Sequence, residues 1–381
     1  MTDSARPPYR ADQVGSLLRP AELKAAHEQW LQGKYDYAEL RKLQDRCILE
    51  AIALQESAGL HAVTDGELRR TSFSTDFIEK LEGAKSPGHL AIQGTAGGLA
   101  TGGQQPGKPF APRAFLVSGK LRHSRPIEAE NFNFVMAHTR RTPKQAIPSP
   151  TMLLRGGRDA VSREAYPDLA QFHADVTRVY QEELKQLGEA GCSYLQLDDT
   201  NYAYLCDPKL IETFREWGYD PAGMPERFAK LINACISGRP AGMTVGIHIC
   251  RGNSSGQWAA QGPYEPVADE LLNTLEVDGF FLEYDDARSG GFEPLRFFPK
   301  GSTKRVVLGL VSSKNPAVES KDVLKRRIEE ASKYVPLENL CLSPQCGFAS
   351  TFKGNPITPE VQKRKLELVV QVATEVWGSA K

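Results

Sequence analysis

The chain has 381 residues, of which 40% are hydrophobic and 25% are charged. This composition is typical of a globular protein, and a chain of this length can bury a large core without disulfides to staple it. Lysine plus arginine and aspartate plus glutamate are equal at 47 each. The balanced charge argues against a nucleic-acid-binding protein, which would normally carry a basic excess.

The N-terminal segment MTDSARPPYR lacks the apolar core of a signal peptide, and the sequence contains no apolar run of about 18 residues. We therefore expect a soluble, cytoplasmic protein with no membrane partner. An odd number of scattered cysteines argues against a disulfide framework and favours a metal or catalytic role for some of them. The seven are Cys47, Cys192, Cys206, Cys235, Cys250, Cys341 and Cys346.

Short apolar segments that end in polar or small residues recur along the chain and predict strands. They cover residues 12–17, 61–67, 146–152, 194–198, 244–250, 279–283, 305–311 and 340–346. The third is the weakest, because it contains two prolines, which fit poorly in a central strand. Helical patterns occupy residues 21–31, 37–57, 169–190 and 320–334.

The alternation of strands with helices predicts an α/β protein with a parallel sheet. Eight such units in a chain of this length favour a (β/α)₈ barrel (a TIM barrel) that occupies residues 1–381 as a single domain. The active residues of such barrels lie where strands end, and polar side chains stand at these ends here. A doubly wound open sheet is the alternative, but no GxGxxG motif follows the first predicted strand.

A stretch rich in glycine and proline, residues 83–113, interrupts the second βα unit. We expect a long loop insertion over about residues 83–125, with a short hairpin at 114–122. The stretch lacks the Gly-Lys-Ser/Thr ending of a phosphate-binding loop. A flexible flap or a subunit-contact arm is the favoured interpretation, and the arm would make the protein a homo-oligomer.

His248 and Cys250 close the fifth predicted strand, and residues two apart on a strand point the same way. An imidazole and a thiolate aimed at one point suit Zn²⁺. Glu283 ends the next predicted strand and Cys346 the last. The sequence therefore predicts a zinc site formed by these four residues. Coordination to a dication would deprotonate a bound substrate thiol at neutral pH.

Six motifs lie in order at the predicted strand ends: V-G-S at 14–16, D-G-E at 65–67, L-Q-L-D at 195–198, H-I-C at 248–250, FFLEYDD around Glu283, and P-Q-C-G at 344–347. On these motifs the chain resembles the catalytic C-terminal barrel of cobalamin-independent methionine synthase, and its single-barrel relatives, over nearly its whole length. Full-length members also carry an N-terminal barrel, for which we expect no room in this chain.

The resemblance implies that His248, Cys250, Glu283 and Cys346 ligate zinc. It also implies that Ser16, Glu67 and Asp198 bind the amino-acid portion of homocysteine. The chemistry agrees, because an α-ammonium favours carboxylates and a carboxylate favours hydroxyl and amide donors. The expected reaction is transfer of a methyl group to a zinc-bound thiolate, most simply that of homocysteine to give methionine.

The methyl-donor side departs from the family pattern. Lys314 stands where the family has a histidine in a His-Ser-Pro motif, and the family's folate-stacking tryptophan is missing from residues 151–155. Methyltetrahydrofolate is therefore not assigned as the donor. The candidate donor-side residues are Arg155, Asp199, Tyr204 and Lys314. Arg251 and Arg288 are further candidates for contact with an anionic substrate.

Four alternatives stay open at this point. An epoxyalkane:coenzyme M transferase type would alkylate a sulfonate thiol with similar zinc chemistry, but would want cations in place of Glu67 and Asp198. A methyltransferase that uses a corrinoid or another non-folate donor fits the altered donor side. The barrel could also hold a purely structural zinc, or belong to the metal-free uroporphyrinogen decarboxylase type, which has no use for His248 and Cys250.

Overall fold

The computed structural model describes residues 6–85, 114–253, 256 and 259–381. The described strands are β1 (Ala62–Val63), β2 (Glu82–Lys85), β3 (Leu116–Arg122), β4 (Thr142–Pro143), β5 (Gln145–Pro148), β6 (Tyr194–Asp199), β7 (Thr244–Ile249), β8 (Gly279–Glu283), β9 (Arg305–Val311) and β10 (Leu340–Pro344).

The described α-helices are α1 (Ala21–Leu31), α2 (Tyr37–Ser57), α3 (Thr75–Ile78), α5 (Ala129–His138), α6 (Leu169–Glu189), α7 (Asn201–Tyr204), α8 (Pro208–Glu216), α9 (Met224–Ile236), α10 (Lys321–Ser332) and α11 (Pro359–Trp377). Short helical turns lie at Pro150–Leu154, Gly157–Ala160, Pro221–Gly223, Glu270–Thr274, Ala287–Ser289, Glu293–Phe297 and Leu337–Asn339.

A parallel sheet forms the centre of the molecule, which confirms the α/β prediction. Six strands pair in the order β10-β9-β8-β7-β6-β5, and β1 pairs with β4, which directly precedes β5 in the chain. A parallel bridge between Ala11 and Leu342 adds the N-terminal segment beside β10. Parallel pairing therefore runs from Ala11 across the sheet to β1. Thr64 also donates a hydrogen bond from its hydroxyl to the carbonyl of Gly15 (2.7 Å), which links the two ends of this series.

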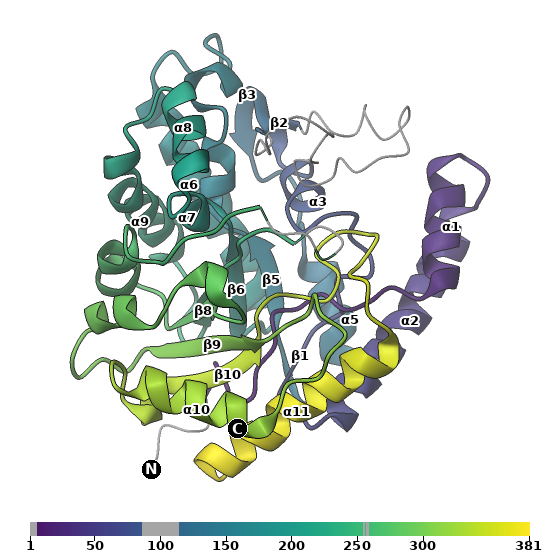
Figure 1. Ribbon diagram of the computed structural model, residues 1–381. Coiled ribbons are helices and arrows are strands. Elements are labelled where there is room, and N and C mark those ends of the chain that lie inside the picture. Colours follow the sequence, from purple (N-terminus) through teal and green to yellow (C-terminus); the bar gives the residue numbers. More distant parts are fainter. Residues whose placement is uncertain (1–5, 86–113, 254–255, 257–258) are drawn as a thin grey trace.

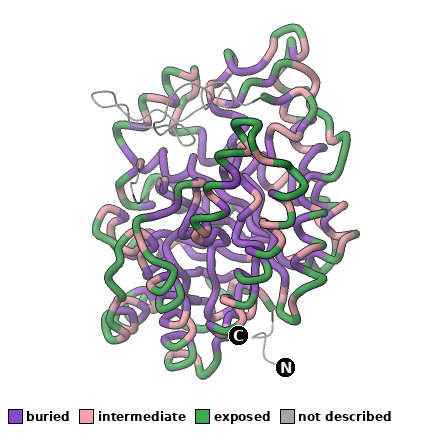
Figure 2. The backbone as a smooth tube through the Cα atoms, turned by 90° about the vertical axis from the view of Figure 1, so that its right-hand side faces the viewer, coloured by how far each residue is buried: buried purple, intermediate pink, exposed green. Residues whose placement is uncertain are grey.

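Helices surround the strands and bury one face each. Figure 1 shows α6, α8 and α9 on one side of the strands, α1 and α2 on the other, and α10 and α11 below. The longest helices begin with a side-chain cap: Asp36 accepts the amide of Glu39, and Asp168 that of Ala170. Strands β6 and β8 are buried along their whole length, as expected of parallel strands covered on both faces. Figure 2 shows the buried backbone gathered in the interior.

The first predicted strand is absent, and the second and third are shorter than expected. Residues 12–17 form no strand, because the Asp12 carboxylate accepts the amides of Tyr9 (3.0 Å) and Gln13 (2.8 Å), so these groups are not free for a ladder. Of the second predicted strand, only Ala62–Val63 form a strand (β1), and a turn follows. The third ends at Pro148, and a 3₁₀ turn begins at Pro150. The predicted ends were wrong here because side-chain hydrogen bonds and prolines interrupt the strands.

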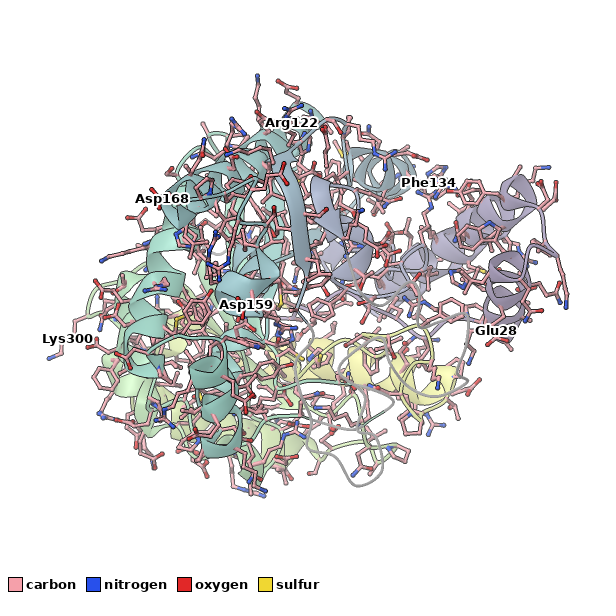
Figure 3. All side chains as sticks on the ribbon, turned by 90° about the horizontal axis from the view of Figure 1, so that it is seen from above. Glu28, Arg122, Phe134, Asp159, Asp168 and Lys300 are labelled. Atoms are coloured by element: carbon pink, nitrogen blue, oxygen red, sulfur yellow. The ribbon has the colours of Figure 1, made fainter. Side chains whose placement is uncertain are left out.

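The hairpin predicted within residues 114–122 is a single strand, β3, which pairs antiparallel with β2. The two flank the glycine-rich stretch, of which residues 86–113 lie outside the described part of the chain. Figure 3 views the molecule from above, with Glu28 of α1 and Lys300 at opposite edges. None of the helices among the described residues combines the length and apolar character needed to cross a bilayer.

Candidate metal and substrate site

Strand β7 and the end of β10 place three candidate metal ligands together. His248 lies in β7, and Cys250 directly follows this strand, where its amide donates to the carbonyl of Asp199 (2.8 Å). Cys346 lies two residues beyond β10. The sulfurs of Cys250 and Cys346 are 3.3 Å apart, and the ligand atoms of all three residues lie within 4.8 Å of one another. All three side chains are buried.

The donor set and its hydrogen bonding fit a metal ion. Among the described residues, neither ring nitrogen of the buried His248 has a partner in good hydrogen-bond geometry, whereas buried polar groups are normally paired. A hydrogen bond with Cys250, assisted by the contact with His248, holds the pKa of Cys346 well below its usual value, although burial opposes this. One imidazole and two closely spaced sulfurs, one of them readily deprotonated, are suitable ligands for zinc. The three residues thus form a possible metal site.

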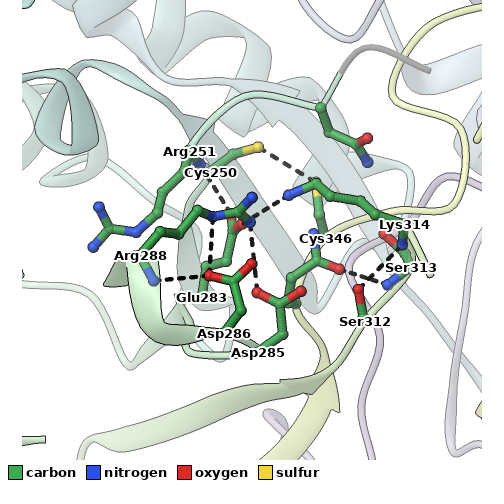
Figure 4. Close-up of polar contacts among 12 residues, drawn as sticks. Cys250, Arg251, Glu283, Asp285, Asp286, Arg288, Ser312, Ser313, Lys314 and Cys346 are labelled. Carbon is green, nitrogen blue, oxygen red and sulfur yellow. Dashed lines mark hydrogen bonds and ion pairs between the residues drawn. The ribbon is translucent and has the colours of Figure 1, made fainter. Parts of the chain in front are cut away.

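Glu283, the fourth predicted ligand, lies outside this group and is surrounded by cations (Figure 4). Its Oε1 accepts a hydrogen bond from Lys314 Nζ (2.8 Å) and is paired with Arg288, while its Oε2 accepts the backbone amide of Arg251 (2.9 Å). Burial alone would raise the pKa of Glu283, but Lys314 and Arg288 lower it to about 2. The carboxylate is therefore ionised, and each of its oxygens already accepts at least one hydrogen bond.

The predicted substrate residues approach the metal group, that is His248, Cys250 and Cys346, from three segments. Asp198 of β6 is the ladder neighbour of His248. Ser16 lies so close to Gly347 that a Cβ atom there would be 1.9 Å from its hydroxyl oxygen. Ser16 is therefore in contact with the residue that follows Cys346. The structure brings Asp198 and Ser16 to the edge of the group that contains His248 and Cys346.

Glu67 is held in an unusual backbone conformation. It has a φ of 56°, the one positive φ of a non-glycine residue among those described, and such strain is concentrated at functional sites. The turn is fixed by Asp65, which accepts the Glu67 amide (2.8 Å), and by Arg19, which donates to the Glu67 carbonyl (2.8 Å). Burial raises the pKa of Glu67, and Asp198 adds to this effect while Arg70 opposes it. Glu67 and Asp198 thus influence each other electrostatically across the site.

The predicted donor-side residues fall into two places. Arg155 donates from Nε to the side chain of Asn201 (2.8 Å), and its guanidinium lies 5.2 Å from the centre of the Tyr204 ring. Asp199 is close by, but its carboxylate accepts the Thr151 hydroxyl and the Tyr202 amide, which is a structural role. Lys314 is elsewhere, on Glu283. The structure therefore groups three of the four candidates and separates the last.

Sequence reasoning missed one buried arginine beside the site, and it considered two others only for substrate contact. Arg19 is buried and donates to four carbonyls, those of Glu67, Arg70, Ala349 and Thr351, so it ties the Glu67 turn to the segment after Cys346. No local pattern marks this residue. Arg288, considered for substrate contact, pairs with Glu283 and Asp285. Arg251 is buried, and its guanidinium lies 4.3 Å from the centre of the Tyr264 ring.

Comparison with known proteins places this site in a family context. The chain matches the family model "Cobalamin-independent synthase, Catalytic domain" over residues 10–375. It is 42% identical over 374 residues to the uncharacterized protein YxjG of Bacillus subtilis, covering 98% of this chain and 96% of that protein. It is 27% identical over 343 residues to a methionine synthase of Pyrococcus abyssi, covering 88% and 84% of the two chains.

Two solved structures are similar to this chain. A Listeria monocytogenes protein assigned as a vitamin-B12-independent methionine synthase superposes with a TM-score of 0.76 at 33% identity, covering 98% of this chain and 99% of that one. A B12-independent methionine synthase from Shewanella, in complex with selenomethionine, gives a TM-score of 0.71 at 21% identity, covering 96% and 97%, which shows a shared fold. On the family match and these relatives, the chain belongs to the cobalamin-independent methionine synthase family.

Proposed function

We propose that this protein catalyses zinc-dependent transfer of a methyl group to a thiol, with homocysteine as the acceptor and methionine as the product. The observation that carries the proposal is the buried convergence of His248, Cys250 and Cys346. Family membership supports the reaction class. A closed (β/α)₈ barrel as the scaffold and a cytoplasmic location are part of this proposal, and the parallel pairing from Ala11 to β1 supports the barrel.

His248, Cys250 and Cys346 would hold the zinc ion. When bound, zinc lowers the pKa of the acceptor thiol so that the thiolate is available near neutral pH. Glu67 and Asp198 would bind the α-ammonium group, because both are buried carboxylates that influence each other across the site. Ser16, against Gly347, would donate its hydroxyl to the α-carboxylate. These residues orient the acceptor with its sulfur toward the cysteines.

The methyl donor is proposed to contact Arg155 and Tyr204, which form one buried cluster with Asn201. Tyr204 also lies close enough to Cys250 for the two groups to interact electrostatically. The cluster has a cation and an aromatic ring, which suits a planar or anionic donor. A corrinoid or another non-folate donor is compatible with this pair, as is a folate bound differently from the family pattern.

A donor screen tests the proposal. Zinc-loaded protein would be given homocysteine with methyltetrahydrofolate, methylcobalamin, or simple methylthiols and betaines, and methionine would be measured. We expect methionine from at least one donor. Turnover of a different thiol, with none of homocysteine, would overturn the acceptor assignment and favour the epoxyalkane:coenzyme M transferase type.

Two cysteine variants test whether the reaction depends on zinc. Cys250→Ser should lose both zinc and activity, because it removes one of three converging ligands. Cys206→Ser is the matched control, since this buried thiol donates to the Tyr202 carbonyl (3.4 Å) away from the metal group. It should keep both properties. Retention of full activity by metal-free Cys250→Ser would contradict the proposal.

A further inference from the structure

One face of β6 holds the N-terminal segment through alternate residues. Tyr194 and Gln196 are two residues apart on this strand, so their side chains point to the same face. The Tyr194 hydroxyl donates to the Asp12 carboxylate (2.8 Å), and the Gln196 side-chain amide donates to the Val14 carbonyl (2.6 Å). Alternate residues of β6 thus bind alternate residues of the N-terminal segment.

The next residues in this alternation are Asp198 on β6 and Ser16 in the N-terminal segment, both proposed to bind the acceptor. We propose that Gln196 is a positioning residue that orients the Asp198 carboxylate for the α-ammonium group of the acceptor. The inference rests on the proposed function in so far as it takes the acceptor to be an α-amino acid bound at Asp198. The Gln196 amide donates to Asp198 Oδ1 (2.7 Å) as well as to Val14. It therefore links this carboxylate to the segment that carries Ser16.

The two acceptors determine how the Gln196 amide is oriented. Its Nε2 carries two hydrogens and lies against the Val14 carbonyl and Asp198 Oδ1. A reversed amide would place Oε1 against two other acceptor oxygens, so the hydrogen-bond network fixes the orientation. Among the described residues, Oδ2 of Asp198 accepts no hydrogen bond. Gln196 thus holds one oxygen of the carboxylate and leaves the other for a bound cation.

Gln196 occupies a position where an apolar side chain would be less costly. It is fully buried, every residue of β6 is buried, and its Oε1 has no hydrogen-bond partner within the described part of the chain. A buried polar atom without a partner destabilises the folded state. Departures of this kind from the local rules of packing are expected where a side chain serves function. The bond to Asp198 indicates what that function is.

The N-terminal segment is held independently from the side of β1. The Thr64 hydroxyl donates to the Gly15 carbonyl (2.7 Å), and a Cβ atom on Gly15 would lie 3.1 Å from Glu67 Oε1. Gly15 has a φ of 141°, which a glycine adopts readily, so the backbone can pass this close to the carboxylate. Loss of the Gln196 amide should therefore disturb Asp198 while the contacts of Thr64 and Glu67 remain.

Binding of methionine and of its analogue without the amino group tests the inference. Dissociation constants of L-methionine and 4-(methylthio)butanoate would be measured by ligand-observed NMR titration of the zinc-loaded wild type and Gln196→Met. Methionine has a length similar to that of glutamine but no donor. The variant should weaken L-methionine at least about tenfold more than the analogue, the lower end of the effect of a hydrogen bond to a charged group. A disturbance of the carboxylate-binding side affects both ligands and cancels in this ratio. A smaller ratio would overturn the inference.

Gln181→Met is the matched control, because Gln181 also donates from Nε2 to a backbone carbonyl, that of Ala234 (2.9 Å), between α6 and α9. It should leave both dissociation constants unchanged. Circular dichroism would confirm that each variant folds, and Gln196→Leu would replace Gln196→Met if that variant does not. A wild type that binds no methionine would reject the proposed acceptor and this inference together. A wild type that binds methionine, with a ratio below tenfold, would reject the role of Gln196 and leave the proposed acceptor standing.

Discussion

Gly347 is the residue at which a single added methyl group should be most informative. It follows Cys346 and packs against Ser16, where a Cβ atom would lie 1.9 Å from Oγ, 3.1 Å from Cβ and 3.2 Å from the backbone nitrogen. The backbone of Ser16 cannot move away freely, since its carbonyl accepts the Phe348 amide (2.8 Å), so its side chain must rotate as well. Atoms at a carbon–carbon optimum are about 3.5–4 Å apart, so relief requires a shift of more than about 1 Å. Overpacking of this kind costs about 1–3 kcal/mol.

Equilibrium urea unfolding, followed by circular dichroism, measures this effect. Gly347→Ala should lower the free energy of unfolding by about 1–3 kcal/mol. Gly223→Ala is the matched control, because Gly223 has an ordinary φ of −86° and the nearest atom to an added Cβ is 3.9 Å away. Adding Ser16→Gly to Gly347→Ala should recover a large part of the loss. If Gly347→Ala were as stable as the control, the close packing of Ser16 against the metal-ligand segment would be refuted.

Two further predictions concern buried charges. His123 Nε2 contacts Glu183 at 2.6 Å, and although burial lowers the pKa of His123, this carboxylate outweighs it and raises the pKa. Stability from this pair should be complete below about pH 6.5 and lost as the pH rises through the folded pKa. His123→Gln should remove this dependence of the free energy of unfolding on pH, as measured by urea unfolding between about pH 5.5 and 9. The change across this range should be about 1.5–3 kcal/mol, the contribution of a charged hydrogen bond. The same pH dependence in the variant would contradict the prediction. Arg19→Met should leave four carbonyls without their donor, lowering stability by at least about 3 kcal/mol and raising the KM for the thiol. Arg19→Lys should recover part of both, and an unaffected KM would reject the link between Glu67 and the Cys346 segment.

The later strands could be predicted from sequence almost to the residue. The bounds of β8 and β9 are those expected, and β6, β7 and β10 differ from expectation by one or two residues. These strands are largely apolar and almost wholly buried, so their burial defines most of their length. The N-terminal strand could not be predicted in this way, because Asp12 binds neighbouring amides through its own side chain. Local hydrogen bonds of this kind leave no hydrophobic pattern.

The candidate site, like the fold, could be predicted from the sequence only in part. His248 and Cys250 share a strand face, and Cys346 follows a strand that belongs to the same parallel sheet, so their meeting follows from fold class. The partners of Glu283 did not follow, since Lys314 is 31 residues away and its side chain could reach several places. Arg19 is a similar case, because its four acceptors come from two distant segments. The pattern of strands predicts which backbone positions lie close together. It does not predict the partners of long side chains such as those of Lys314 and Arg19, because these can reach several segments of the fold.

The pairing of β2 with β3 has a consequence for how the chain can vary in length. Lys85 is paired with Leu116, so the two ends of the intervening segment are fixed beside each other by an antiparallel ribbon. Once the ends of a loop are held together, each doubling of its length adds only about 0.6 kcal/mol of closure entropy. The β2–β3 ribbon therefore fixes the closure of this segment independently of its length. The position of β3 is thus set by its pairing with β2 and not by the number of residues between Lys85 and Leu116.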